Sequence, residues 1–157
     1  MVHDRCWTAA RRKQHNLQDD DSCTACLQLP ETIPHILIEC VFAREIWTIL
    51  FNKWNWFRLA AQLAVHEEFI DWWQWSRKEM HRDDRKTFDT LVVLVAWLLW
   101  KERNNLTFQG INLTARDMVL KILEERKAWA SAGFTHLLKL FPKVASFRSQ
   151  SHFNVIA

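Results

Sequence analysis

The chain has 157 residues, 49% of them hydrophobic, and a formal net charge of +3. This length suits one domain, or one domain with a small metal-stabilised appendage. Two glycines and three prolines are too few for a turn-rich β architecture. The mild positive charge permits a nucleic-acid partner without arguing for one, because nucleic-acid-binding surfaces are usually denser in lysine and arginine. We therefore expect a mainly α-helical protein.

The N-terminal sequence bears on the compartment. The first 20 residues contain no apolar run of the kind found in secretory signals. Cysteines kept as thiols for a metal also favour a reducing compartment, so we expect an intracellular protein, nuclear or cytoplasmic. Arg5, Arg11, Arg12 and Lys13 give a faint likeness to a mitochondrial transit peptide, but the amphipathic stripe of such a peptide is missing.

The first part of the chain is predicted to be a short basic helix over 4–14, followed by a polar loop over 16–22. Asp19, Asp20 and Asp21 in this loop are consecutive acids. Such a run is typical of a solvated segment rather than of a catalytic carboxylate pair.

Three cysteines and a histidine follow this loop. Cys23, Cys26, His35 and Cys40 have the spacing C-x2-C-x8-H-x4-C, and thiolate and imidazole are the ligands that complete a four-coordinate Zn²⁺ site. The first gap lets two cysteines bind one ion from a tight turn, and the last gap lets a helix direct His35 and Cys40 inward. With four protein ligands, no position remains for water or substrate, so the spacing indicates a structural site.

Other interpretations of these four residues stay open. Cysteines are often small buried hydrophobic residues, and His35 could be a partly buried histidine without a metal. A redox disulfide between Cys23 and Cys26 is a further alternative, although such pairs usually lie in a βαβ context and no strand pattern surrounds this one. Cys6 lies 17 residues upstream of Cys23, and we expect it to be a free thiol.

The remainder of the chain is predicted to be helical. Apolar residues recur at helical spacing from Pro34 to Asn52, with a bend near 41–43, and a packed connector follows. A helix over 67–80 precedes a long helix over 84–108, which Gly110 ends. The run at 91–100 is apolar on every face, which is typical of a central helix covered by neighbours. It is about half the 20 residues that a membrane span needs.

A last long helix is predicted to begin at Thr114, with Asp117 completing a rough capping box. The predicted architecture is mainly α, with a small CCHC zinc knuckle near the N-terminus followed by a helical bundle with a long apolar central helix. This architecture divides the chain into a zinc-binding module with flanking helices (1–53), a helical region packed with it (54–141) and a flexible tail (142–157).

Several of these motifs together resemble a known family. The stretches CTAC (23–26), PETIPH (30–35) and FAREIW (42–47), with Cys40 between the last two, are similar to the zinc-binding domain that follows the reverse transcriptase in plant non-LTR retrotransposons. The stretch WLLWKERN (97–104) with Phe108 resembles a segment that often trails this domain, and WTAARR (7–12) is similar to the short helix that precedes it. The likeness covers about residues 5–132.

The resemblance implies a structural Zn²⁺ bound by the four ligand residues, but not a polymerase. A reverse transcriptase needs metal-binding aspartates, typically in a [FY]-x-D-D turn; this chain has no tyrosine, and its Asp19–Asp21 run follows Gln18 in a polar loop. The six other histidines lack a partnered nucleophile or carboxylate at motif spacing. We therefore expect no enzymatic activity.

Two functions remain as hypotheses. The family is thought to assist template binding, which implies RNA or DNA contact; Trp7, Arg11, Arg12, Lys13 and Arg44 lie near the predicted knuckle, where basic groups could contact phosphates and the aromatic could stack on a base. The same residues could instead be a packed tryptophan and a solvated basic face.

The second hypothesis is a co-opted host protein that acts through protein–protein contacts or self-association. Phe69, Trp72, Trp73 and Trp75 crowd one short segment, and exposed aromatics are typical interface anchors. The alternative is that they cover the long helix of the same chain.

Overall fold

The computed structural model describes residues 6–66 and 68–140, and this part of the chain is mainly α-helical, as predicted. Its only β pairing is an isolated bridge between Ser22 and Pro30. In chain order the elements are α1 (Ala9–Gln14), the π-helical turn η1 (His35–Glu39), α2 (Val41–Lys53), α3 (Phe57–Ala61), α4 (Phe69–Glu79), the 3₁₀ turn η2 (Arg82–Asp84), α5 (Arg85–Gln109), α6 (Ala115–Ser131) and the 3₁₀ turn η3 (Thr135–Leu140).

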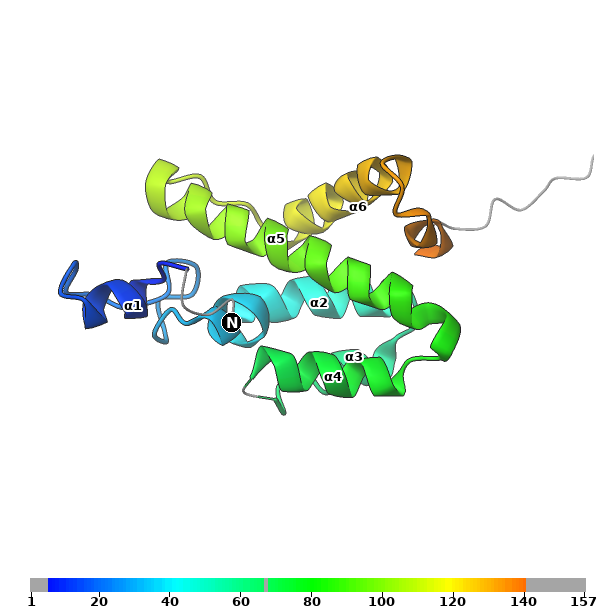
Figure 1. The fold of residues 1–157 in the computed structure, drawn as a ribbon. Coiled ribbons are helices and arrows are strands. Elements are labelled where there is room, and N and C mark those ends of the chain that lie inside the picture. Colours follow the sequence, from blue (N-terminus) through cyan, green and yellow to red (C-terminus); the bar gives the residue numbers. More distant parts are fainter. Residues whose placement is uncertain (1–5, 67, 141–157) are drawn as a thin grey trace, which may run out of the picture.

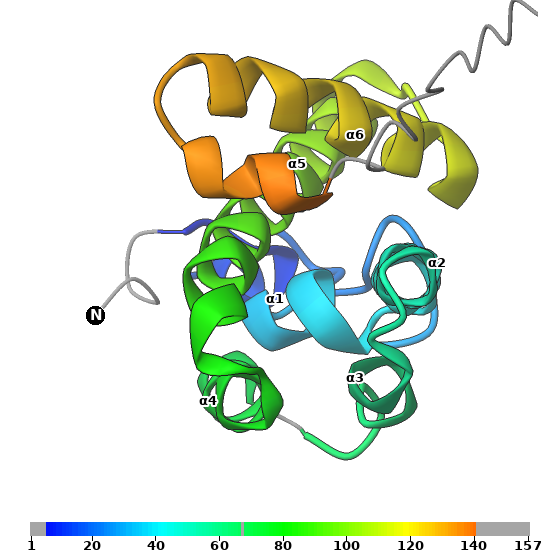
Figure 2. The ribbon, with the colours of Figure 1, turned by 90° about the vertical axis from the view of Figure 1, so that its right-hand side faces the viewer.

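The longest of these elements, α5, organises the rest. It contacts η1, η2, α4, α6 and η3. In Figure 1 it runs diagonally below α6 and above α2, α3 and α4, and α2 also contacts α6 directly; Figure 2 gives the view turned by 90°. The short helix α1 and the loop after it lie near the C-terminal end of α5 (Figure 1). The metal-ligand motif is therefore placed against the end of α5.

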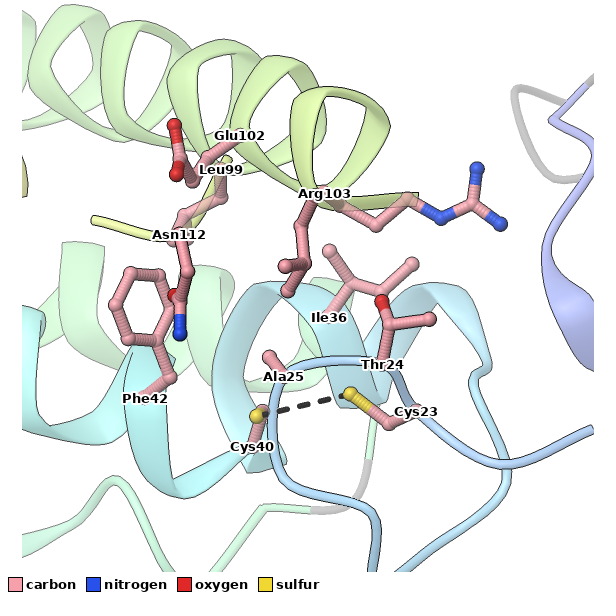
Figure 3. Close-up of a pocket in the computed structure, with 11 residues that line it drawn as sticks. Cys23, Thr24, Ala25, Ile36, Cys40, Phe42, Leu99, Glu102, Arg103 and Asn112 are labelled. Carbon is pink, nitrogen blue, oxygen red and sulfur yellow. Dashed lines mark hydrogen bonds between the residues drawn. The ribbon is translucent and has the colours of Figure 1, made fainter. Parts of the chain in front are cut away.

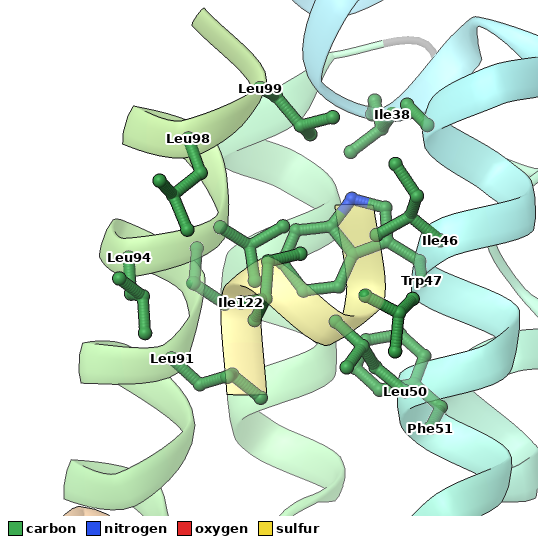
Figure 4. Packing of buried hydrophobic residues seen from close by; sticks show 14 of the residues in the cluster. Ile38, Ile46, Trp47, Leu50, Phe51, Leu91, Leu94, Leu98, Leu99 and Ile122 are labelled. Carbon is green, nitrogen blue, oxygen red and sulfur yellow. The ribbon is translucent and has the colours of Figure 1, made fainter. Parts of the chain in front are cut away.

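The core is rich in aromatic rings from α2, α4 and α5. The ring centroids of Trp47 and Trp72 are 5.1 Å apart, and those of Trp72 and Phe88 are 6.2 Å apart. Leucines of α5 project toward Trp47 in the middle of the core (Figure 4). The indole N–H of Trp47 donates to the carbonyl of Leu37 at 2.8 Å, so this buried polar group is satisfied.

The helix α5 ends where the sequence indicated but is not covered on every face. Gly110 adopts φ +68°, a left-handed conformation that suits a helix C-terminus. Val93 and Trp97, however, are 52% and 40% exposed, because α4 and α6 leave one strip of the helix open. No helix among the described residues has the length and apolarity required to cross a membrane.

The last helices are fixed at both ends. The hydroxyl of Thr114 accepts a hydrogen bond from the backbone N–H of Asp117 at 3.1 Å, which confirms the predicted cap of α6. At the other end, the carbonyl of Leu140 accepts hydrogen bonds from the Trp54 indole at 3.0 Å and the Arg126 guanidinium at 2.8 Å. The predicted tail, 142–157, lies outside the described residues.

Candidate metal centre

The first two cysteines lie in a tight loop between α1 and η1. The Ser22–Pro30 bridge closes this loop at its base. Within it the N–H of Cys23 donates to the carbonyl of Leu29 at 2.9 Å, and the N–H of Leu27 donates to the carbonyl of Cys23 at 2.8 Å. Leu27 adopts φ +56°, so the chain reverses direction directly after Cys26 and both sulfurs face the same side.

The second pair of ligands is positioned by a π-helical turn rather than by an α-helix. In an α-helix, residues five apart differ in direction by about 140°, so His35 and Cys40 would face different sides. Here the N–H of Cys40 donates to the carbonyl of His35 at 2.8 Å, and Cys40 itself is extended (φ −56°, ψ 136°) before α2 begins. The wider turn brings both side chains to one place, which agrees with the frequent use of π-turns at functional sites.

These elements bring the four predicted ligands together. One ligand atom from each of Cys23, Cys26, His35 and Cys40 lies within 4.8 Å of the other three. The sulfurs of Cys23 and Cys40 are 3.9 Å apart (Figure 3), and the sulfur of Cys26 is 3.3 Å from Nε2 of His35. In a tetrahedral zinc site with Zn–S bonds of about 2.3 Å, two sulfurs are about 3.8 Å apart. The cluster therefore has the dimensions of a metal site.

Electrostatics shift the pKa values of the cluster residues in different directions. A hydrogen bond with Cys40 lowers the pKa of the Cys23 thiol, and the same contact raises the pKa of Cys40, because the two sulfurs compete for one proton. Burial by itself would lower the pKa of His35, but hydrogen bonds to Cys23 and Cys26 outweigh it and raise the pKa. The raised pKa of His35 favours the imidazolium, whereas a metal binds the neutral imidazole, so metal binding at this cluster would release a proton.

The residues present fit a structural metal ion. Three sulfurs and one imidazole nitrogen are a donor set suited to zinc, and all four cysteines of the chain are free thiols. Nδ1 of His35 lies 3.7 Å from a carboxylate oxygen of Glu39, which is beyond hydrogen-bond distance. The cluster could hold a metal ion, with Cys23, His35 and Cys40 buried and Cys26 half-buried.

A buried ion pair supports the loop from outside the cluster, and sequence reasoning missed it. Glu31 is fully buried, and its Oε1 accepts hydrogen bonds from the backbone N–H of Ala9 at 2.8 Å and from Nε of Arg103 at 2.9 Å. Its neighbour Thr32 caps the following turn by accepting a hydrogen bond from the N–H of His35 at 3.2 Å. Glu31 instead joins α1, the loop and α5.

The predicted nucleic-acid residues differ in their surroundings: Trp7 and Lys13 are exposed, whereas Arg11, Arg12 and Arg44 are half-buried. Trp7 is 47% exposed, and the Arg11 guanidinium lies 5.0 Å from its ring centroid. Lys13 is exposed and pairs with Asp21 at 3.0 Å. Arg12 is half-buried, with its guanidinium 6.0 Å from the ring of Phe108. Arg44 is also half-buried, on α2.

Of these residues, Arg11 lines a surface hollow beside α1. A depression of about 320 Å³ lies between α1 and the start of η1, and it is lined by Cys6, Thr8, Ala10, Arg11, Gln14, His15, Thr32, Ile33 and Pro34. The ring of His15 packs edge-on against Trp7 at 5.4 Å. The surface around α1 therefore combines an aromatic ring with cationic groups.

Of the predicted protein-interaction residues, Trp72 is not an exposed anchor, and a partner-binding role for the half-buried Phe69, Trp73 and Trp75 stays a prediction. Trp72 is fully buried among the core rings. The indole of Trp73 donates to the carboxylate of Asp89 on α5 at 3.0 Å, and Phe69 and Trp75 are half-buried against the core. The aromatic side chains of α4 therefore pack against the rest of the same chain, with Trp72 in the core and Trp73 against α5.

Comparison with known proteins gives one match, in the region of the cluster. Residues 1–47 match the family model described as zinc-binding in reverse transcriptase. No curated protein and no solved structure matches the chain. The matched residues contain all four ligand positions, Glu31 and most of α1 through α2. The N-terminal segment of this chain is therefore similar to the zinc-binding domain of reverse transcriptases.

Proposed function

We propose that the chain is a non-catalytic zinc-binding module, derived from the reverse transcriptase of a plant non-LTR retrotransposon, that contacts single-stranded nucleic acid in the nucleus or cytoplasm. The observation that carries the proposal is the convergence of Cys23, Cys26, His35 and Cys40 within 4.8 Å, in the segment that matches a zinc-binding family.

Zinc is the metal that this donor set favours. Thiolates bind soft metals, and a tetrahedral site of sulfur and imidazole is typical of Zn²⁺. Structural zinc contributes on the order of 10–16 kcal/mol of apparent binding free energy near neutral pH. The role of the ion here is to order the loop from Ser22 to Pro30, which has few apolar contacts of its own.

A closed ligand set also supports a role without catalysis. A catalytic zinc keeps one coordination position for water or substrate, whereas the four side chains here would fill every position. The function then rests on the surface that the ordered loop and α1 present.

That surface suits an unpaired nucleic-acid strand. Trp7 offers a half-exposed ring on which a base could stack, and Arg11 and Lys13 supply positive charge on α1, which begins two residues after Trp7. Base–aromatic stacking contributes about 1–3 kcal/mol per base in single-strand binding proteins. Phosphate contacts add a term that weakens as salt rises.

The metal is tested by elemental analysis of the purified chain. One zinc per chain is expected, and Cys26→Ser should lower the content well below one. Cys6→Ser is the matched control, because it removes a thiol outside the cluster. A zinc-free protein with intact helices would contradict the metal assignment.

The nucleic-acid contact is tested by binding of a single-stranded RNA at several salt concentrations. Trp7→Ala with Arg11→Ala should weaken binding and flatten its salt dependence, whereas Lys78→Ala, which removes an exposed cation on α4, should not. Binding that is independent of salt, or equal in all variants, would contradict this part of the proposal while leaving the zinc site intact.

A further inference from the structure

An apolar groove lies between α2 and α6, far along the chain from the metal loop. It has a volume of about 580 Å³ and is lined by Ile49, Lys53, Arg116, Val119, Leu120 and Leu123. We call it the α2–α6 groove. None of these residues belongs to the metal cluster or to the α1 surface.

The apolar floor of the groove has the dimensions of a helix-binding site. Leu120, in the middle of α6, is 61% exposed, and Ile49 and Leu123 are half-buried beside it. From Arg116 to Leu123 the groove follows α6 for about 10 Å, or two turns. An amphipathic helix that inserts side chains at positions i, i+3 or i+4 and i+7 covers this length.

The charged residues of the groove are all of one sign. Lys53 and Arg116 are both exposed, and neither has an ion pair within residues 6–66 and 68–140. Two neighbouring acids on α6 have partners within the chain: Glu124 pairs with Lys127 at 2.7 Å, and Asp117 accepts from the hydroxyl of Thr114 at 2.6 Å. No aspartate or glutamate is among the residues that line the groove in the described part of the chain.

We propose that the α2–α6 groove binds an amphipathic helix of another protein, whose apolar face covers Leu120 and whose flanking positions carry aspartate or glutamate. Complementary charge selects the partner and speeds its association. The chain's own C-terminal segment is a poorer fit, because residues 141–157 contain Lys143 and Arg148 but no aspartate or glutamate. This surface adds a protein partner to the proposed function and does not depend on zinc or nucleic acid.

The occupant can be identified by photocrosslinking in the full chain. A benzoylphenylalanine replaces the exposed Leu120, and the probe is a synthetic helical peptide of about 18 residues, five turns, with leucines on one face and glutamates beside them. Mass spectrometry of the crosslinked product should place the peptide at the groove. The matched control carries the same photoreactive group at Leu138, which is 54% exposed but does not line the groove, and should not crosslink.

Charge reversal tests the chemistry of the partner. The glutamate peptide should bind at least about tenfold more tightly than an isomer with lysines in place of glutamates, and Lys53→Glu with Arg116→Glu should reverse that preference. Leu120→Asp should weaken both complexes without loss of helicity. Crosslinks to residues 141–157 or to a second copy, absence of any crosslink, or a preference that charge reversal leaves unchanged would each overturn the proposal.

Discussion

Glu31 and Arg103, 72 residues apart in the sequence, form an ion pair in which both side chains are almost completely shielded from water. The carboxylate belongs to Glu31, which directly follows the loop that carries Cys23 and Cys26, and the guanidinium belongs to Arg103 in the last third of α5. The same carboxylate oxygen accepts the N–H of Ala9 at the start of α1. Three segments thus meet at one buried charge. Figure 3 shows Arg103 on α5, across a cavity of about 30 Å³ from Cys23 and Cys40.

Neutralising one member of this pair should destabilise the protein strongly. Glu31→Gln leaves the Arg103 guanidinium buried without a counter-charge, which costs about 3–5 kcal/mol in comparable cases. Urea unfolding followed by tryptophan fluorescence measures the loss. Glu79→Gln is the control, since Glu79 pairs with Arg58, which is 82% exposed, and exposed pairs contribute about 1 kcal/mol or less. Equal losses in the two variants would contradict the structural importance of the buried pair.

Metal removal should loosen two separated segments together. Chelation frees the loop from Ser22 to Pro30, and Glu31 then no longer holds Arg103, so the last turn of α5 should lose protection from hydrogen exchange along with the loop. The aromatic core of α2, α4 and α5 should stay protected, because its rings contact one another directly, as Trp47 and Phe88 each contact Trp72. Hydrogen-exchange mass spectrometry with and without chelator checks this. Loss of protection in the loop alone, or in all helices, would contradict the proposed coupling between the loop and the C-terminal part of α5.

Truncating Trp72 should cost far more than truncating a surface aromatic. Trp72→Ala removes a fully buried side chain that contacts the rings of Trp47, Phe51, Phe69 and Phe88, and such substitutions cost about 3–5 kcal/mol. Phe57→Ala, at a position that is 57% exposed, should cost less than about 1 kcal/mol. Thermal and urea unfolding compare them. Similar costs would mean that Trp72 is not part of the core.

The end of α5 depends on a left-handed residue. Gly110→Ala should destabilise the protein by about 1 kcal/mol, because a Cβ disfavours φ +68°, and Gly110→Asn should cost less, since asparagine tolerates this region better. No atom lies within 4 Å of the position a Cβ would take, so crowding is not the cause. Chemical unfolding of the two variants distinguishes them; an alanine variant as stable as the parent would refute the conformational argument.

The sequence predicted the cluster because its evidence is local. The ligand residues and the short gaps between them all lie within 18 consecutive residues, from Cys23 to Cys40. The cap at Thr114 and the stop at Gly110 were predictable for the same reason. The ion pair of Glu31 and Arg103 was not, because nothing local tells a buried carboxylate from a helix cap when its partner is 72 residues away.

The sequence pattern also could not predict which faces of the helices are buried. An apolar run from 91 to 100 predicted full coverage of α5, yet Val93 and Trp97 stay exposed because the number of neighbouring helices limits what can be covered. Conversely, Trp72 and Trp73 looked too crowded to be buried, but one enters the core and the other bonds to Asp89. The α2–α6 groove arises between helices distant in sequence, so no single segment indicated it.

The π-turn of His35 to Glu39 limits how this metal loop can change in length. Because five residues of backbone carry His35 onto the same side as Cys40, one inserted or deleted residue between them would swing an imidazole or a thiol away from its partners. The interval from Cys26 to His35 is an exposed loop for most of its course, where added residues are tolerated. We therefore expect related loops to vary in length between the residues equivalent to Cys26 and His35, and to keep a constant length between those equivalent to His35 and Cys40.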